Sequence, residues 1–286
     1  MANNQKTEVL PKQHQDRQPG FEYKMHPLPK YIKESYQGSG KLKDQVAIIS
    51  GGDSGIGRSV AVHYAKEGAH IAIIYYDEDQ DANETKKAVE AAGVSCSLFR
   101  GDISDSAFCN EVVEKVIAEH GKINIVVNNA AMQFPQQNFL NITDDQLEKT
   151  FRVNIFSYFY LTRAALRYLK QGSVIINTSS ITAFQGSENL IDYSSTKGAI
   201  TTFTKSLAKS LVKQGIRVNS VAPGPIWTPL IPASFDENEV ATFGSDSEMG
   251  RPGEPCEVAP AYVYLASNDG SYVTGQTIHV NGGKIV

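Results

Sequence analysis

Short apolar runs alternate with helix-forming segments through most of this 286-residue chain, and this alternation constrains the fold more than any other feature. Each run is apolar on both of its faces, as in parallel strands that are covered by helices. Repeated strand–helix–strand units predict an α/β fold, a doubly wound parallel sheet of seven strands with helices on both faces. Strands are expected at 45–50, 70–76, 95–100, 123–128, 173–179, 216–222 and 277–280, and helices at 55–67, 80–92, 105–120, 143–169, 190–213 and 255–267.

Residues 1–40 differ in composition from the rest of the chain. They are rich in Pro, Gln and Lys and carry scattered aromatic residues, which is a poor composition for an independent core. We therefore expect an N-terminal extension over 1–40 and one domain over 41–286. Two states of the extension stay open: a solvated tail, or an extended arm that lies against the domain or a neighbouring subunit.

Charge and composition exclude several classes of protein. The net charge of −4 and the pI of about 5.9, without a basic cluster, argue against a nucleic-acid binder. No apolar run is long enough to cross a bilayer, and the N-terminus lacks the apolar stretch of a signal peptide, so we expect a cytoplasmic protein. The three cysteines follow no metal-ligand spacing, which predicts reduced thiols and no metal site.

The segment "SGGDSGIG" at 50–57 stands between the first expected strand and the first expected helix. Gly51 permits a tight turn out of the strand, Gly55 removes a side chain where backbone meets a pyrophosphate, and Gly57 allows the helix and strand to pack closely. The unpaired N–H groups of the helix N-terminus attract an anion. A glycine-rich turn without a ligand is the plainer alternative, but the position in the fold favours a Rossmann-type dinucleotide site.

Several further motifs appear in a fixed order along the chain. They are "GDIS" at 101–104, "NNAA" at 128–131, "FRVNIF" around Asn154, "INTSSI" around Ser180, "YSSTK" at 193–197, "PGPIWT" at 223–228 and "GQTIHVNGG" at 275–283. Together with the glycine spacing G-x-x-x-G-x-G, these motifs make residues 43–286 resemble the classical short-chain dehydrogenase/reductase family. Ala131 stands where the family usually has Gly, a change of one methyl group. The N-terminal extension is similar to that of a bacterial branch with general-stress proteins and glucose-dehydrogenase-like reductases.

This resemblance implies the residues that contact the cofactor. Asp102 and Ile103 are implied as adenine contacts, the "NNAA" segment lies beneath the adenosine ribose, the backbone near Ile226 meets the carboxamide, and Thr228 lies near the phosphates. The full set of implied cofactor contacts is Gly51, Asp53, Ser54, Gly55, Ile56, Gly57, Tyr75, Tyr76, Asp77, Gly101, Asp102, Ile103, Asn129, Ala130, Ala131, Thr178, Tyr193, Lys197, Pro223, Gly224, Ile226 and Thr228.

Tyr193 and Lys197 are four residues apart in an expected helix, so both lie on one face. A phenol has an ordinary pKa of about 10, and a neighbouring ammonium group favours its ionised form. Two solvated helix residues are the alternative for such a pair. The family resemblance implies that Tyr193 is the general acid/base and that Lys197 binds the nicotinamide ribose and lowers the pKa of the phenol. It also implies that Ser180 orients the substrate oxygen and that Asn154 holds a water of a proton relay.

The function implied is hydride transfer between nicotinamide and a carbonyl or alcohol carbon. A cofactor-binding sensor or scaffold without turnover is the alternative, and an extended-family epimerase or dehydratase is disfavoured by the glycine spacing. Asp77 lies twenty residues after Gly57, where an acid binds ribose hydroxyls and repels a 2′-phosphate. Because neither Ser54 nor the "YYDED" run offers a cation, NAD is expected, with NADP use left open.

The substrate is expected to be a small carbonyl compound or alcohol under a mobile lid over 225–252. Its identity is not readable from the sequence, although the similar branch points to a small carbonyl or polyol. The resemblance also implies a homotetramer, a dimer of dimers, that pairs through the helices expected at 143–169 and 190–213.

Overall fold

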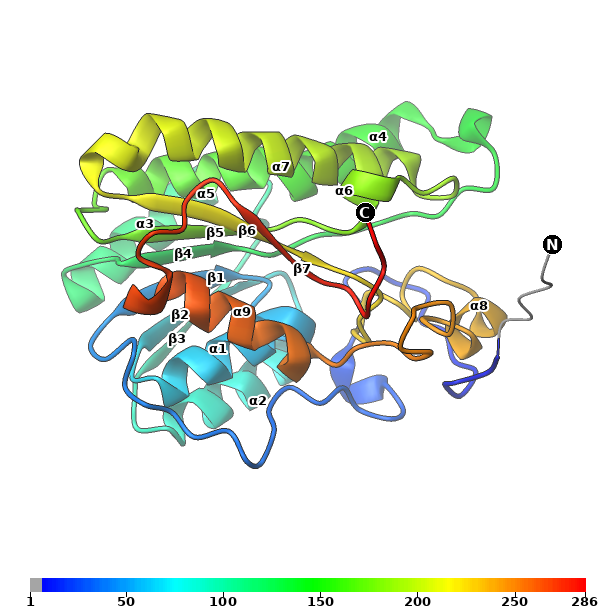
Figure 1. Cartoon of the computed structure of the whole chain (residues 1–286), viewed down its shortest axis with the longest axis horizontal. Helices are drawn as coiled ribbons and strands as arrows, with labels where there is room; N and C mark the ends of the chain where they lie inside the picture. The colour runs from blue at the N-terminus through cyan, green and yellow to red at the C-terminus, as the bar shows by residue number, and fades with distance from the viewer. Residues whose placement is uncertain (1–6) are drawn as a thin grey trace.

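The computed structural model describes residues 7–286, whose centre is a single parallel sheet in the order β3-β2-β1-β4-β5-β6-β7 (Figure 1). Every neighbouring pair of strands is parallel. The seven-stranded doubly wound sheet predicted from the sequence is therefore confirmed. The strands are β1 Val46–Ser50, β2 His70–Tyr75, β3 Cys96–Arg100, β4 Ile125–Asn128, β5 Val174–Thr178, β6 Arg217–Pro223 and β7 Thr277–Val280.

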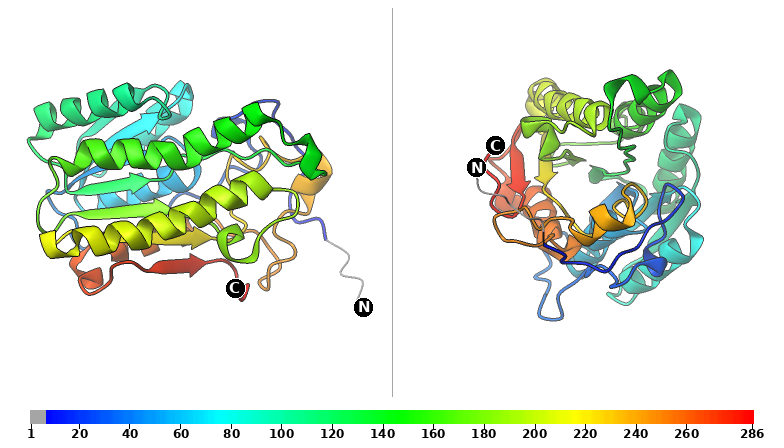
Figure 2. Two further views of the ribbon diagram at one scale, coloured as in Figure 1. Left: turned by 90° about the horizontal axis from the view of Figure 1, so that it is seen from above. Right: turned by 90° about the vertical axis from the view of Figure 1, so that its right-hand side faces the viewer.

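Helices cover both faces of the sheet (Figure 2). One face packs against α1, α2 and α9, and the other against α3, α5 and α7. The helices are α1 Gly55–Lys66, α2 Asp79–Glu90, α3 Ser106–His120, α4 Asp144–Phe151, α5 Ser157–Leu166, α6 Thr182–Gln185, α7 Ile191–Leu211, α8 Glu237–Ala241 and α9 Pro255–Ala266.

Alternate residues of each strand enter opposite cores. In β1, Ala47 and Ile49 pack toward α1 and α9, whereas Val46 and Ile48 pack toward α3 and α5. All four are almost fully buried. This two-sided burial is why the strands read as continuous apolar runs in the sequence.

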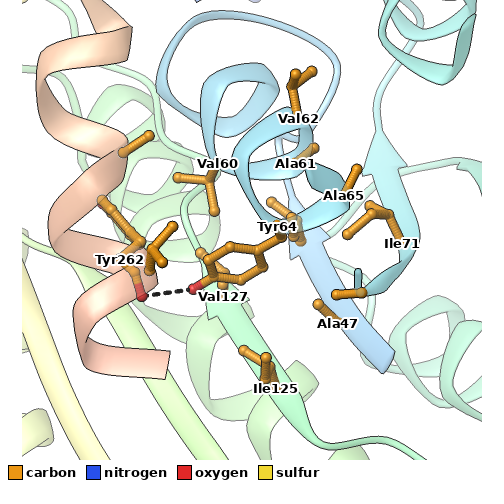
Figure 3. Packing of buried hydrophobic residues seen from close by; sticks show 14 of the residues in the cluster. Ala47, Val60, Ala61, Val62, Tyr64, Ala65, Ile71, Ile125, Val127 and Tyr262 are labelled. Carbon is orange, nitrogen blue, oxygen red and sulfur yellow. Dashed lines mark hydrogen bonds between the residues drawn. The ribbon is translucent and has the colours of Figure 1, made fainter. Parts of the chain in front are cut away.

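Helices α1 and α9 lie side by side over one face of the sheet (Figure 3). Tyr64 of α1 is fully buried between them and donates a hydrogen bond of 3.1 Å to the carbonyl oxygen of Tyr262. The buried phenol is thus satisfied, and the two helices are joined by a polar contact within an apolar core.

The single helix expected at 143–169 is in fact two helices joined by a π-helical turn, Arg152–Phe156, between α4 and α5. Asn154 lies in this turn and is fully buried. Its side chain exchanges two hydrogen bonds of 2.8 Å with the backbone of Met132, in the loop after β4. Turns of this type frequently mark functional sites, and here the turn brings a buried amide to the end of the sheet.

The described N-terminal residues run along the outside of the domain, beside the segment that carries α8 (Figure 1). Leu10 and Gln15 donate backbone hydrogen bonds to the carbonyls of Ala241 and Pro232. Further along, Cys256 donates its backbone N–H to Lys30, at the start of α9. Within residues 7–37 the regular structure is one 3₁₀ turn, Glu22–Lys24, so tertiary contacts hold this segment in place.

Candidate active site

A cavity of about 620 Å³ opens at the carboxyl ends of the central strands. The chain proceeds from β1 to β2 and β3 on one side, and resumes with β4 on the other side of β1. The carboxyl edge at such a reversal is where doubly wound sheets bind their ligands. Residues after β1, β4, β5 and β6 line this cavity, including Gly51, Ala130, Ser180 and Gly224.

The glycine-rich loop has the shape expected of a phosphate-binding turn. Gly51 and Gly55 have φ values of +61° and +51°, a region that disfavours side chains. A Cβ on Gly57 would lie 1.8 Å from the carbonyl oxygen of Gly51, so this glycine permits close packing rather than lining the cavity. The loop therefore leaves bare backbone beside a large cavity, which fits a dinucleotide.

Asn129 connects the ends of three strands beneath this loop. Its amide group donates to the carbonyls of Ser50 and Gly51 at 3.2 and 3.1 Å. Its carbonyl oxygen accepts a hydrogen bond of 3.2 Å from the hydroxyl of Thr178, at the end of β5. The "NNAA" motif therefore fixes the glycine-rich turn relative to β4 and β5.

Ser180, Tyr193 and Lys197 line one end of the cavity. Ser180 follows β5, and the other two lie in the first two turns of α7. Lys197 is almost fully buried, and its Nζ donates a hydrogen bond of 2.9 Å to the carbonyl of Thr178. The same Nζ lies 5.3 Å from the centroid of the Tyr193 ring. The strand end and the helix thus bring the three residues together.

Burial moves the pKa values of this pair in opposite directions. It raises the pKa of Tyr193 to about 12, against the lowering effect of a hydrogen bond with Ser180. It lowers the pKa of Lys197 to about 7. The sequence led us to expect that Lys197 lowers the pKa of the phenol, but burial raises that pKa instead, because desolvation disfavours both charged forms.

Asn154 does not line the cavity. Besides Met132, its amide contacts the hydroxyl of Thr196 at 3.2 Å, in the same helix as Tyr193. The side chain therefore joins the loop after β4 to α7, and the water relay expected of it stays a prediction.

Most of the expected cofactor residues do line the cavity, with Gly57 and Asp77 as the exceptions. Gly57 is a packing residue, as described above. The members of the expected set that line the cavity are Gly51, Asp53, Ser54, Gly55, Ile56, Tyr75, Tyr76, Gly101, Asp102, Ile103, Asn129, Ala130, Ala131, Thr178, Tyr193, Lys197, Pro223, Gly224, Ile226 and Thr228.

The acidic side chain that faces the cavity after β2 belongs to Glu78 rather than Asp77. Glu78 is 1% exposed, and its Oε2 accepts the backbone N–H groups of Tyr76 and Asp77 at 3.2 and 3.1 Å. Within residues 7–286 its Oε1 has no hydrogen-bond partner. Burial, followed by the charge of Asp53, raises the pKa of Glu78 to about 7. A buried acceptor without a donor suits a ligand hydroxyl.

The N-terminal segment contributes residues to the cavity that no sequence motif indicated. Gln18, Pro19 and Gly20 line the cavity. Glu22 is buried, accepts the backbone N–H of Gly55 at 2.5 Å and pairs with Arg58 at 2.6 Å. Burial raises the pKa of Glu22 to about 7, although Arg58 opposes the shift. No local motif marks these residues, because their role depends on a contact with the first turn of α1.

Within residues 7–286, no group of three or more His, Cys, Asp or Glu residues is arranged to hold a metal ion. No helix there combines the length and the apolar character that a bilayer crossing requires.

Residues 51–284 match the family model described as enoyl-(acyl carrier protein) reductase. The chain belongs to the short-chain dehydrogenase/reductase family. It is 58% identical over 286 residues to general stress protein 39 of Bacillus subtilis, covering 100% of this chain and 99% of that protein. It is 48% identical over 283 residues to the glucose and ribitol dehydrogenase of Daucus carota, covering 97% of each.

Solved structures agree with the assignment to the short-chain dehydrogenase/reductase family. A short-chain dehydrogenase from Burkholderia cenocepacia, crystallised in complex with NADP, has a TM-score of 0.80 and 27% identity, over 85% of this chain and 98% of that one. The family resemblance drawn from the sequence motifs is therefore confirmed. As a member of this family, the chain is an NAD(P)-dependent oxidoreductase that acts on CH–OH groups.

Proposed function

We propose that this short-chain dehydrogenase/reductase catalyses reversible hydride transfer to a small carbonyl compound, with Tyr193 as the general acid/base. The observation that carries the proposal is the convergence of Tyr193, Ser180 and a buried Lys197 at one end of the cavity beside the glycine-rich loop. A family member without turnover would have no need of this arrangement.

Tyr193 holds its proton at neutral pH, because burial keeps its pKa near 12. It can therefore donate that proton to a carbonyl oxygen as negative charge develops there. Ser180 offers a second hydroxyl to the same oxygen; its Oγ accepts hydrogen bonds of 3.1 Å from the backbone and the hydroxyl of Thr182, which leaves its own proton to be donated. A bound nicotinamide supplies the hydride in reduction and accepts it in oxidation.

Lys197 acts beside the phenol. Its Nζ is fixed by the carbonyl of Thr178, and burial lowers its pKa to about 7, so the amine exchanges a proton near neutral pH. When Lys197 is protonated, its charge favours ionisation of Tyr193. The two groups together can pass a proton from the substrate oxygen toward the interior of the site. Asn154 is proposed to support this route by holding α7 in register with the loop after β4.

The cofactor is proposed to lie along the carboxyl edge of the sheet. The glycine-rich loop and the first turn of α1 would hold the pyrophosphate, since the bare backbone of Gly51 and Gly55 lines the cavity there, although the N–H of Gly55 is itself donated to Glu22. Glu78 would accept a ribose hydroxyl at its Oε1, which has no hydrogen-bond partner within residues 7–286 and lies 3.7 Å from Nη2 of Arg17. The ribose contact expected of Asp77 is therefore proposed for Glu78.

The substrate is proposed to be a small aldehyde, ketone, sugar or polyol. Similarity to a glucose and ribitol dehydrogenase supports this class. The wall beyond Tyr193 mixes apolar and polar side chains, including Gln185, Leu190, Leu230 and Ile231. Such a wall suits a compact molecule with both hydroxyl groups and a carbon skeleton.

We further infer an N-terminal extension over 1–40, a catalytic domain over 41–286, a cytoplasmic location and a homotetramer. The start of the family match at residue 51 supports the division. Exposed apolar side chains on and beside α4 and α5, including Leu147, Phe156 and Phe159, support pairing through these helices.

The test is turnover by the purified protein, followed by nicotinamide absorbance, on a panel of aldehydes, ketones, sugars and secondary alcohols. NAD(H) and NADP(H) are compared in parallel, and Tyr193→Phe is the matched variant. We expect activity on at least one compound that is lost in Tyr193→Phe. Cofactor binding without turnover on any compound would favour the sensor or scaffold alternative instead.

A further inference from the structure

We propose that Arg17, in the N-terminal segment outside the sheet, binds the 2′-phosphate of NADP and so lets this chain use NADP as well as NAD. The inference rests on the proposed dinucleotide site. It concerns a residue that lies outside residues 51–284, the part of the chain matched by the family model.

The N-terminal segment forms part of the cavity wall directly after Arg17, which contacts Glu78 of the lining but does not line the cavity itself. Gln18, Pro19 and Gly20 line the cavity directly. The side chain of Gln18 holds both backbone groups of Gln133, donating to its carbonyl at 2.5 Å and accepting from its N–H at 3.1 Å. The segment is therefore anchored at the cavity rim immediately after Arg17.

Arg17 is held in a fixed position at this rim. Its Nε donates a hydrogen bond of 2.7 Å to the carbonyl of Pro19, and its guanidinium lies 3.9 Å from the centroid of the Phe21 ring. Its Nη2 pairs with Asp77 and lies 3.7 Å from the Oε1 of Glu78. The side chain is 30% exposed, so a ligand anion can reach it.

The charges around Arg17 explain why the site needs it. Asp53 and Glu78 line the end of the cavity formed by the loops after β1 and β2, Asp77 lies beside Glu78, and each of the three would repel a phosphate. Arg58 is 5% exposed and pairs with Glu22 and Asp81. Within residues 7–286, Arg17 contacts both Asp77 and Glu78 while its side chain stays 30% exposed.

The geometry allows one site to accept two cofactors. A ribose 2′-hydroxyl can donate to the Oε1 of Glu78 while Arg17 stays paired with Asp77. A 2′-phosphate can instead bind the guanidinium of Arg17, which then leaves Asp77 and exchanges one anionic partner for another. Arg is suited to this exchange because its planar guanidinium binds phosphate and carboxylate oxygens in the same bidentate manner.

The test measures binding directly, by calorimetry on the full chain. The ligands are NADP and NAD, and the fragment pair 2′,5′-ADP and 5′-AMP, which differ in the 2′-phosphate. We compare Arg17→Gln, Arg17→Lys and Lys24→Gln, the last being a matched control because Lys24 also stacks on Phe21 in the same segment. Unfolding temperatures of all variants are measured alongside.

We expect Arg17→Gln to weaken NADP and 2′,5′-ADP by about tenfold or more, and NAD and 5′-AMP by less than about threefold. Arg17→Lys should retain part of the preference, and Lys24→Gln should change neither pair. Equal weakening of both pairs would overturn the proposal, since Arg17 would then act only in docking the segment.

An unchanged NADP affinity in Arg17→Gln would also overturn the proposal. So would a wild-type chain that binds NAD but not NADP, and that result would leave the proposed oxidoreductase function standing. A wild-type chain that binds neither dinucleotide would instead remove the proposed function itself.

Discussion

The two ends of the cavity differ in which part of the chain builds them. The end with Ser180, Tyr193 and Lys197 is made by β5 and α7, both inside the packed sheet-and-helix core. The end at the glycine-rich loop is completed by Gln18, Pro19 and Gly20 from the N-terminal segment. The difference teaches that the core can fix the groups proposed for the reaction, while a segment outside the core completes the end proposed for the cofactor.

The two ends also differ in charge. The first holds one buried amine beside a phenol, whose pKa values move apart. The second holds carboxyl groups, and burial raises the pKa of Asp53 to about 6 and that of Glu78 to about 7. Proton transfer is accordingly proposed for the end with Tyr193 and Lys197, and recognition of hydroxyl or phosphate groups for the other end.

The change with the largest expected effect is Tyr193→Phe, which removes one oxygen atom from the end of the cavity with Ser180 and Lys197. Tyr193→Phe should lower kcat by about 10²–10⁴-fold, the usual contribution of a general acid/base. The affinity for NAD(P) should change by less than about threefold, because the glycine-rich end is untouched. Single-turnover kinetics and calorimetry measure the two quantities. Equal loss of both would show that the ends are not independent.

Glu22 and Arg58 form the contact between the N-terminal segment and α1. Glu22→Ala should reduce the free energy of unfolding by about 3 kcal/mol, because it leaves the buried Arg58 without its closest anion. The loss falls at the low end of the usual range, since Arg58 keeps hydrogen bonds to Thr85 and the carbonyl of Asp81.

Urea denaturation measures this effect, and Glu34→Ala, an exposed acid in the same segment, is the control. The cofactor affinity of Glu22→Ala should fall as well, because Glu22 accepts the backbone N–H of Gly55 in the glycine-rich loop. If Glu22→Ala and the control unfold at the same urea concentration, the contact between the N-terminal segment and α1 does not stabilise the glycine-rich end of the cavity.

The pH dependence of activity should be set by ionisation of Tyr193. Because burial raises the pKa of Tyr193 to about 12, the ionised fraction rises about tenfold for each pH unit below that value. Alcohol oxidation, which needs the phenolate, should therefore accelerate from pH 7 to pH 9, by less than about tenfold per pH unit, because Lys197, whose pKa burial lowers to about 7, loses over this interval the charge that favours ionisation of Tyr193. Carbonyl reduction, which needs the phenol, should stay nearly level over the same interval. An oxidation rate that does not rise would contradict the assigned role.

The smallest expected effect is on cofactor affinity, and it distinguishes Glu78 from its neighbour Asp77. Glu78→Gln should weaken NAD binding by about fivefold, since it alters the acceptor that faces the cavity. Asp77→Ala should leave NAD binding nearly unchanged and improve NADP relative to NAD, because it releases Arg17. Parallel titrations with both cofactors measure this. A loss of NAD affinity in Asp77→Ala alone would return the ribose contact to Asp77.

The sequence by itself determined the fold and the family, and it supplied the candidates that are proposed here as the reacting groups. Strands buried on both faces produce apolar runs, and bare backbone in the turn after β1 requires glycine, so both leave local patterns that can be read directly. The pairing of Tyr193 with Lys197 follows from helical spacing alone. All seven expected strands, and every expected helix except 143–169, begin and end within two residues of the observed bounds.

Only the tertiary structure decided where the residues outside these patterns lie. The π-helical turn brings Asn154 to the backbone of Met132, and of Asp77 and Glu78 it is Glu78 that lines the cavity. The positions of Arg17 and Glu22 depend on contacts with residues 60 and 33 positions away. Local sequence cannot encode such contacts, because long-range packing and the burial of charge set both the partner and the pKa.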